Sequence, residues 1–209
     1  MAKMILIMGE PGTGKTSSLR NIPVKEHYYI DCDKKGLNYK GWRKDYSEEN
    51  KNYFKTDDAD TVVKALKLIS EKKPEIHYIT IDTINSIMIA DEMKRYKEKG
   101  FDKWLDLAAC IFSIINKAAD LREDLNIIFI GHSQTDDDGF TRLLTNGKKL
   151  NKIGLEKYFN TVLITKCIDG KYVFETHSNN STARTPMGAF EEDTIENDIM
   201  KVFEVLKEY

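Results

Sequence analysis

Three glycines and a lysine near the start of the chain have the spacing of a phosphate-binding loop. Residues 9–16 read Gly-Glu-Pro-Gly-Thr-Gly-Lys-Thr, which matches G-x-x-x-x-G-K-[ST] between a predicted strand and a predicted helix. Such glycines let the backbone fold back, so that successive N–H groups converge on a phosphate. Lys15 then reaches the terminal phosphates, and the Thr16 hydroxyl is a ligand for Mg²⁺. The sequence therefore predicts a site for ATP and Mg²⁺, and the alternative is a glycine-rich turn that binds nothing. The residues of the predicted site are Gly9, Glu10, Pro11, Gly12, Thr13, Gly14, Lys15, Thr16 and Ser17.

An aspartate ends a second apolar run, where it can meet the magnesium ion. Residues 76–82 read Ile-His-Tyr-Ile-Thr-Ile-Asp, with the alternation of a central strand. A carboxylate in that position is costly to bury without a metal or a partner. Asp82 is therefore the predicted second magnesium ligand, the Walker B residue. The alternative is that Asp82 caps the following helix, although Thr83 can serve as that cap instead.

Polar residues at the ends of two further predicted strands are candidates for handling the attacked phosphate. Asp31 and Asp33 end the second strand, and Asp33 is the candidate for polarising water. An exposed turn acid is the other interpretation of Asp33. His132 follows the apolar run 126–131, at the edge where α/β sheets bind ligands. A sensor of the terminal phosphate and a structural histidine remain equal alternatives for His132.

Short β-rich runs alternate with longer segments of helical period, which predicts an α/β fold with a mainly parallel central sheet and helices on both faces. Two stretches, 34–50 and 133–152, are predicted to be irregular, and long loops in compact domains are usually functional or mobile. The expected strands are 3–8, 28–32, 76–82, 126–131, 161–167 and 171–176, with a short one at 52–55. The expected helices are 14–21, 59–72, 84–99, 103–123 and 195–207.

The composition is that of one soluble domain spanning residues 1–209. The chain is 41% hydrophobic and 32% charged, and its apolar runs are far shorter than the roughly 20 residues of a membrane helix. Three separated cysteines without a C-x-x-C pair favour a reducing compartment, so the cytoplasm is expected. The formal net charge of −2 does not attract a polyanion by itself. Any nucleic-acid site must therefore be local.

These motifs, in this order, resemble the RecA-like P-loop ATPases of bacteriophages, a group of AAA-family ATPases that includes RecA-core single-strand annealing proteins. The resemblance implies a RecA-like fold and ATP hydrolysis on single-stranded DNA in phage recombination or replication, in the host cytoplasm. It also implies a homo-oligomer, a single-strand-binding protein as a partner and a terminal-phosphate contact at His132. Arg184 matches a basic residue that acts on nucleotide across a subunit interface. The matching segments are residues 9–16, 30–33, 81–83, 131–132, 147–150 and 182–188.

In that group the second-strand acid is commonly glutamate, whereas this chain has Asp33, one methylene shorter. Weak hydrolysis is therefore expected. An ordinary surface arginine is the alternative interpretation of Arg184.

A basic segment with aromatic residues follows His132 and is the predicted DNA surface. Residues 139–160 hold five basic side chains and one acidic side chain, a local charge of +4 (5 − 1). Bases can stack on the neighbouring aromatics while lysines contact phosphates. A solvated surface without a partner is the alternative. The predicted DNA contacts are Arg142, Lys148, Lys149 and Lys152.

Two other classes of function remain open. One is a nucleotide or small-molecule kinase, which needs an acceptor pocket and a lid with several arginines, whereas residues 133–152 contain only Arg142. The other is a nucleotide-switched DNA-binding module with little turnover. The destination of the terminal phosphate separates these classes from a DNA-stimulated ATPase.

Overall fold

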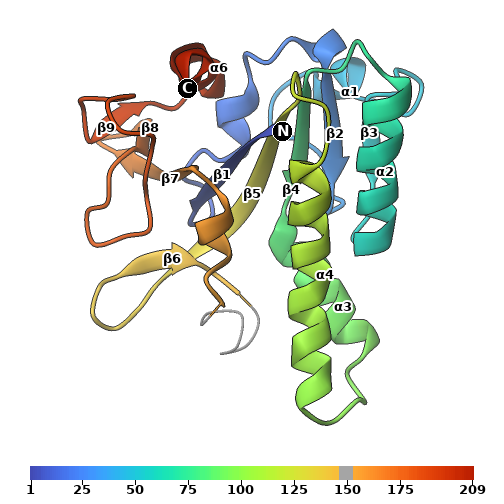
Figure 1. Cartoon of the computed structure of the whole chain (residues 1–209). Helices are drawn as coiled ribbons and strands as arrows, with labels where there is room; N and C mark the ends of the chain where they lie inside the picture. Colours follow the sequence, from blue (N-terminus) through green and yellow to red (C-terminus); the bar gives the residue numbers. More distant parts are fainter. Residues whose placement is uncertain (146–152) are drawn as a thin grey trace.

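A computed structural model describes residues 1–145 and 153–209, apart from the side chains of residues 101, 102, 104, 105, 107 and 108. A nine-stranded sheet crosses the molecule, with helices on both faces (Figure 1). The strand order is β3-β2-β4-β5-β1-β7-β8-β9, and β6 pairs with β5. The strands are β1 (Lys3–Gly9), β2 (His27–Asp31), β3 (Tyr53–Lys55), β4 (Tyr78–Asp82), β5 (Asn126–Thr135), β6 (Thr141–Leu143), β7 (Thr161–Ile168), β8 (Lys171–Glu175) and β9 (Thr194–Glu196).

The central strands are parallel, and their side chains are buried on both faces. β1 pairs in parallel with β5 and β7, and β4 pairs in parallel with β5 and β2. The runs 5–8 and 127–130 have at most 1% of their surface exposed, which explains their continuous apolar sequence. Among the described strands, the antiparallel pairs are β5 with β6, β7 with β8, and β8 with β9. β5 lies between β1 and β4, so the strands that carry the phosphate loop and Asp82 are not neighbours.

Three helices cover one face of the sheet: α2 (Ala59–Lys72), α3 (Ile84–Lys94) and α4 (Phe101–Ala119) (Figure 1). Asp58 caps α2 by accepting a hydrogen bond from the Thr61 N–H at 3.0 Å. Val62, Leu66 and Ile69 repeat every three or four residues along α2, and this stripe is buried in the core of that face. The predicted bounds of α2 are confirmed to the residue.

The opposite face is covered by shorter elements. α6 (Ile199–Val205) and the 3-10 helix η4 (Leu206–Glu208) bury Val202 and Phe203 in a core that also contains Ile128 from β5. Asp198 caps α6 through the Met200 N–H at 3.0 Å. The remaining short helices of the described residues are η1 (Thr16–Leu19), η2 (Val24–Glu26), α1 (Trp42–Asp45) and η3 (Leu155–Tyr158).

Several predicted elements differ from the structure. The segment after the phosphate loop forms only η1, a single 3-10 turn, in place of the helix predicted at 14–21. Residues 194–196 pair with β8, so the last helix begins at Ile199. The loop expected at 133–152 includes the end of β5 and strand β6, which together form a hairpin. Strands β6 and β9 are not predicted because each is defined by its pairing with another strand, and the local spacing of apolar residues does not reveal such pairing.

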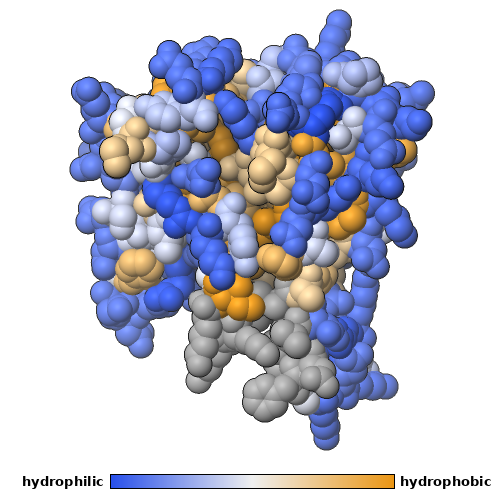
Figure 2. Space-filling view, in the orientation of Figure 1, coloured by the Kyte–Doolittle hydropathy of each residue, from blue (hydrophilic) through white to orange (hydrophobic). Residues whose placement is uncertain are grey.

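No helix within the described residues is long and apolar enough to span a lipid bilayer. Polar side chains cover most of the face shown in Figure 2, with a smaller apolar area near its centre.

Candidate functional site

A cavity of about 400 Å³ lies beside the carboxyl ends of β1, β4 and β5, where parallel α/β sheets bind ligands. The sheet register places His132 of β5 opposite Gly9 of β1. Asp82 of β4 lies opposite Ile130, two residues before His132 on β5. The phosphate loop, the Asp82 carboxylate and His132 therefore converge, as the sequence predicts. The lining residues are Pro11, Gly12, Gly14, Lys15, Thr16, Ser17, Lys35, Gly36, Leu37, Asn38, Asp82, His132 and Tyr172.

The phosphate loop has the backbone conformation that requires its glycines. Gly12 and Gly14 have φ values of +80° and +100°, a region that side chains with a Cβ rarely adopt. A Cβ on Gly9 would lie 2.1 Å from the Thr165 hydroxyl, so β7 approaches the start of the loop closely. The hydroxyls of Thr13 and Thr165 are 2.6 Å apart, which ties the loop to β7. The neighbouring strands thus hold the loop in shape.

The Lys15 ammonium is folded back onto its own loop. It donates hydrogen bonds to the carbonyl oxygens of Gly9 at 2.8 Å and Glu10 at 2.7 Å. Burial lowers its pKa to about 8, although the nearby Asp82 carboxylate acts in the opposite direction. Because the Lys15 ammonium is already buried, it can bind an anionic phosphate with little further loss of hydration.

This pKa predicts that Lys15 makes a growing contribution to stability as the pH rises from 8 to 10, while the buried thiols and tyrosines, whose pKa values are raised, contribute with the opposite sign. In the unfolded chain Lys15 keeps its proton until about pH 10.5, whereas in the folded chain it releases the proton near pH 8. At this residue the unfolded state then binds more protons, so the contribution of Lys15 to the free energy of unfolding rises with pH. We expect a contribution of roughly 2 kcal/mol, at about 1.36 kcal/mol per pKa unit. Urea unfolding of the wild type and Lys15→Met at pH 8 and 10 isolates it, because the thiols and tyrosines contribute equally to both proteins. The same change in the free energy of unfolding in both proteins would contradict this assignment.

Asp82 is buried beneath the loop and has one carboxylate oxygen without a partner. Its Oδ2 accepts hydrogen bonds from the Thr16 hydroxyl at 2.9 Å and the Tyr29 hydroxyl at 2.5 Å. Among the described residues, its Oδ1 is buried and has no hydrogen-bond partner. Burial raises the pKa of Asp82, while the hydrogen bond from Tyr29 opposes that shift.

An unsatisfied buried oxygen next to a threonine hydroxyl fits a magnesium ion, which prefers hard oxygen ligands. Thr16 and Asp82 would hold the ion, whose role when bound is to neutralise charge on the phosphates.

The two acids at the end of β2 have different roles. Asp31 is 1% exposed, and its Oδ2 accepts hydrogen bonds from the Gly36 N–H at 2.7 Å and the Tyr53 hydroxyl at 2.5 Å. It therefore anchors the segment that lines the cavity. Asp33 lies beyond the strand end, and its Oδ1 accepts a hydrogen bond from the Thr83 hydroxyl at 2.8 Å.

Asp33 is held in the ionised form. Burial by itself would raise its pKa, but hydrogen bonds from Lys35, Ser86 and Thr83 outweigh burial and hold the pKa at about 2. Lys35 forms an ion pair with its Oδ2. Asp33 can orient a water molecule but is a weak proton acceptor, so its proposed part in hydrolysis stays a prediction.

His132 is fixed at the cavity through its backbone. Its N–H donates to Asn85 Oδ1 at 2.7 Å, and its carbonyl accepts a hydrogen bond from the Leu144 N–H at 2.8 Å. Burial, helped by the charge of Lys15, lowers the pKa of the imidazole. Its Nδ1 is buried and has no partner among the described residues. A neutral ring with a free nitrogen suits a polar ligand contact, and the sensor role stays a prediction.

Arg184 does not join this group. Its guanidinium donates to the backbone carbonyl of Phe159 at 3.0 Å and also to that of Glu156. The Arg184 backbone pairs with Val162. In this fold Arg184 fastens the segment before β7, and its action across a subunit interface stays a prediction.

Of the predicted DNA contacts, only Arg142 lies within the described residues; Lys148, Lys149 and Lys152 lie outside them. Arg142 is on β6, forms an ion pair with Asp136 and has its guanidinium carbon 5.1 Å from the centre of the Phe140 ring. The acidic run 136–138 is at the turn of this hairpin, so one of its members neutralises the predicted basic contact.

The residues at the site that sequence reasoning missed include Tyr29, Lys35 and Tyr172. Tyr29 touches Asp82 from the neighbouring strand, and Lys35 lies in a segment predicted only as irregular. Tyr172 is on β8, and its ring would meet a Cβ on Gly14 at 2.9 Å. Each depends on the order of strands in the sheet, for which the sequence contains no local signal.

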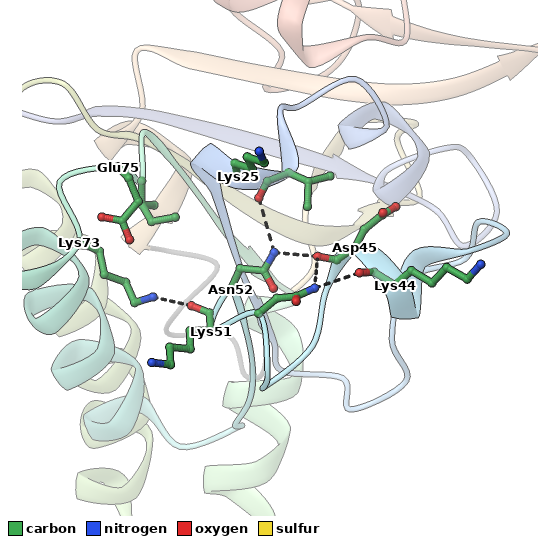
Figure 3. Close-up of a pocket in the computed structure, with 10 residues that line it drawn as sticks. Lys25, Lys44, Asp45, Lys51, Asn52, Lys73 and Glu75 are labelled. Carbon is green, nitrogen blue, oxygen red and sulfur yellow. Dashed lines mark hydrogen bonds between the residues drawn. The ribbon is translucent and has the colours of Figure 1, made fainter.

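A larger cavity, of about 540 Å³, lies at the opposite edge of the sheet, before β2, β3 and β4 (Figure 3). Its polar groups largely satisfy one another. The Lys73 ammonium donates to the Lys51 carbonyl at 2.6 Å, and the Asn52 amide donates to the Asp45 carbonyl at 2.8 Å. No residue of the phosphate loop lines it, so the smaller cavity is the candidate phosphate-binding site.

Comparisons with known proteins agree with this geometry. Residues 1–183 match the family model described as an AAA domain. The structure is similar to that of a KaiC-like protein from the hyperthermophilic archaeon Pyrococcus horikoshii, with a TM-score of 0.53 and 11% identity, covering 82% of this chain and 76% of that protein. None of the curated proteins searched gives a match. The predicted RecA-like fold with a mainly parallel sheet is confirmed.

Proposed function

Because the chain belongs to the AAA domain family, we propose that it binds ATP with Mg²⁺ and hydrolyses it while acting on single-stranded DNA in phage recombination or replication. The contact between Thr16 and Asp82 is the observation that carries the nucleotide part of this proposal. It brings two hard oxygen ligands together below a glycine loop that contains a buried cation. Those are the parts that position and neutralise a triphosphate.

The DNA part of the proposal is supported by the hairpin that follows His132. β5 continues directly from His132 into this hairpin, which contains Arg142 and Phe140. A groove of about 450 Å³ lies between the hairpin and β7 and reaches Glu10 and Thr13 of the phosphate loop. A strand bound there would lie next to the nucleotide, so that occupancy of one site can change affinity at the other.

The test is steady-state ATP hydrolysis at low salt, with and without single-stranded DNA, in the wild type, Lys15→Ala and Arg142→Ala. We expect DNA to stimulate the wild type, Lys15→Ala to be inactive, and Arg142→Ala to keep the basal rate while losing stimulation. Low salt is required because phosphate contacts weaken as salt rises. A hydrolysis rate that does not change when DNA is added would refute the DNA part of the proposal and leave the nucleotide part standing. Transfer of phosphate to a small acceptor would instead support a kinase.

A nucleotide switch with little turnover is the second candidate. The observation that favours it is the ion pair between Asp33 and Lys35, which occupies the carboxylate expected to orient water. In that case ATP binding alone would change DNA affinity, and a non-hydrolysable ATP analogue would act as well as ATP.

A further inference from the structure

Two lysines line the cavity of the phosphate loop: Lys15, which belongs to the loop, and Lys35, which lies outside it. Its side chain is 56% exposed, forms an ion pair with Asp33 Oδ2 and lines the same cavity as Lys15 and Thr16. The charge of Lys35 also lowers the pKa values of Lys15 and His132. The ammonium group pairs with Asp33, which is bound by Thr83 next to Asp82, and the cavity that Lys35 lines is also lined by Asp82 and His132, where the loop directs terminal phosphates.

The backbone immediately after Lys35 is fixed. The Gly36 N–H is held by the buried Asp31 carboxylate, which also accepts a hydrogen bond from the Tyr53 hydroxyl. Trp42 packs so closely on Gly36 that a Cβ there would lie 2.3 Å from its ring. A flexible side chain on a rigid segment can exchange one anionic partner for another without moving the loop.

We infer that Lys35 binds the terminal phosphate of ATP and that, in doing so, it leaves Asp33 Oδ2 free to orient the attacking water. The inference rests on the proposed function, since it concerns the same nucleotide site. Asp33 and the terminal phosphate compete for one ammonium group. ADP lacks that phosphate and leaves the ion pair in place, so Lys35 distinguishes ATP from ADP.

The experiment measures dissociation constants for Mg-ATP and Mg-ADP by calorimetric titration in the wild type, Lys35→Ala, Lys35→Arg and Lys34→Ala. Lys34 is the matched control, because it is the adjacent lysine, has a similarly exposed side chain and pairs with Asp57, away from the cavity. We expect Lys35→Ala to weaken ATP binding about tenfold or more and ADP binding much less, since charge-assisted bonds to phosphate are strong. Lys35→Arg should keep most of the preference for ATP, and Lys34→Ala should match the wild type.

Asp33→Asn provides an independent readout. Removing the competing carboxylate should tighten ATP binding severalfold while lowering the rate of hydrolysis, which a merely structural Asp33 would not do. Equal weakening of ATP and ADP by Lys35→Ala, or no change in either, would overturn the inference while leaving the proposed function intact. A wild type that binds neither nucleotide would overturn both.

Discussion

Asp82→Asn should reduce ATP hydrolysis by about a hundredfold or more and make nucleotide binding nearly independent of Mg²⁺. The asparagine has the shape of aspartate but lacks its charge, and its amide would place N–H donors or a neutral oxygen where Oδ1 has no partner. Without the metal ion, the transition state loses several kcal/mol of charge stabilisation. A loss of about 2.7 kcal/mol corresponds to a hundredfold lower rate. The measurement is nucleotide affinity with Mg²⁺ and with EDTA, alongside the hydrolysis rate.

Tyr29→Phe is the matched variant for this experiment. It keeps the Asp82 charge and removes only the hydrogen bond of 2.5 Å to Oδ2. A hydrogen bond to a charged group contributes roughly 1.5–3 kcal/mol, so Asp82 would be less firmly oriented but would still hold the ion. Tyr29→Phe should therefore retain Mg²⁺-dependent binding with a smaller loss of rate. If Asp82→Asn bound nucleotide with the wild-type dependence on Mg²⁺, Asp82 would not be a magnesium ligand.

Gly9→Ala should destabilise the protein and prevent the phosphate loop from forming. The new Cβ would lie 2.1 Å from the Thr165 hydroxyl and 2.9 Å from the Thr165 carbonyl oxygen. The hydroxyl can rotate, but the carbonyl belongs to the backbone of β7, so the loop itself has to move. Overpacking of this kind costs about 1–3 kcal/mol. Urea unfolding and nucleotide titration should show both the lower stability and a loss of binding.

Gly170→Ala is the control for a glycine replaced in the same sheet. Gly170 lies in the turn between β7 and β8 with φ of +75°, and a Cβ there would have nothing within 4 Å. Alanine should cost about 1 kcal/mol through the strained backbone alone and leave nucleotide binding unchanged. If both variants bound nucleotide normally, the close approach of Gly9 to Thr165 would not be what shapes the loop.

The parts of this fold that depend on local chemistry could be predicted, as could the mainly parallel sheet, but which strands are neighbours could not. The helical period and the capping Asp58 give α2 its bounds, and the glycine loop identifies Lys15 and Thr16. In contrast, β9 is defined by its pairing with β8 across about twenty residues of intervening chain.

The candidate site shows the same division. Asp31 and Asp33 have equivalent places at the end of a predicted strand, yet one is an internal anchor and the other faces Lys35. Sequence cannot distinguish them, because the difference arises from Tyr53 on the edge strand and Thr83 beyond β4. Tyr29 escapes prediction for the same reason, since its hydroxyl matters only once β2 lies beside β4.

The position of β5 between β1 and β4 makes one strand the spacer between the loop that carries Lys15 and the strand that carries Asp82. Neighbouring strands are held about 4.8 Å apart by main-chain hydrogen bonds, so the width of this gap is a property of the backbone. Every residue type except proline can make those bonds. Evolution can therefore replace most of the side chains in the three strands without changing the distance between the strand that leads into the loop and the strand that carries Asp82.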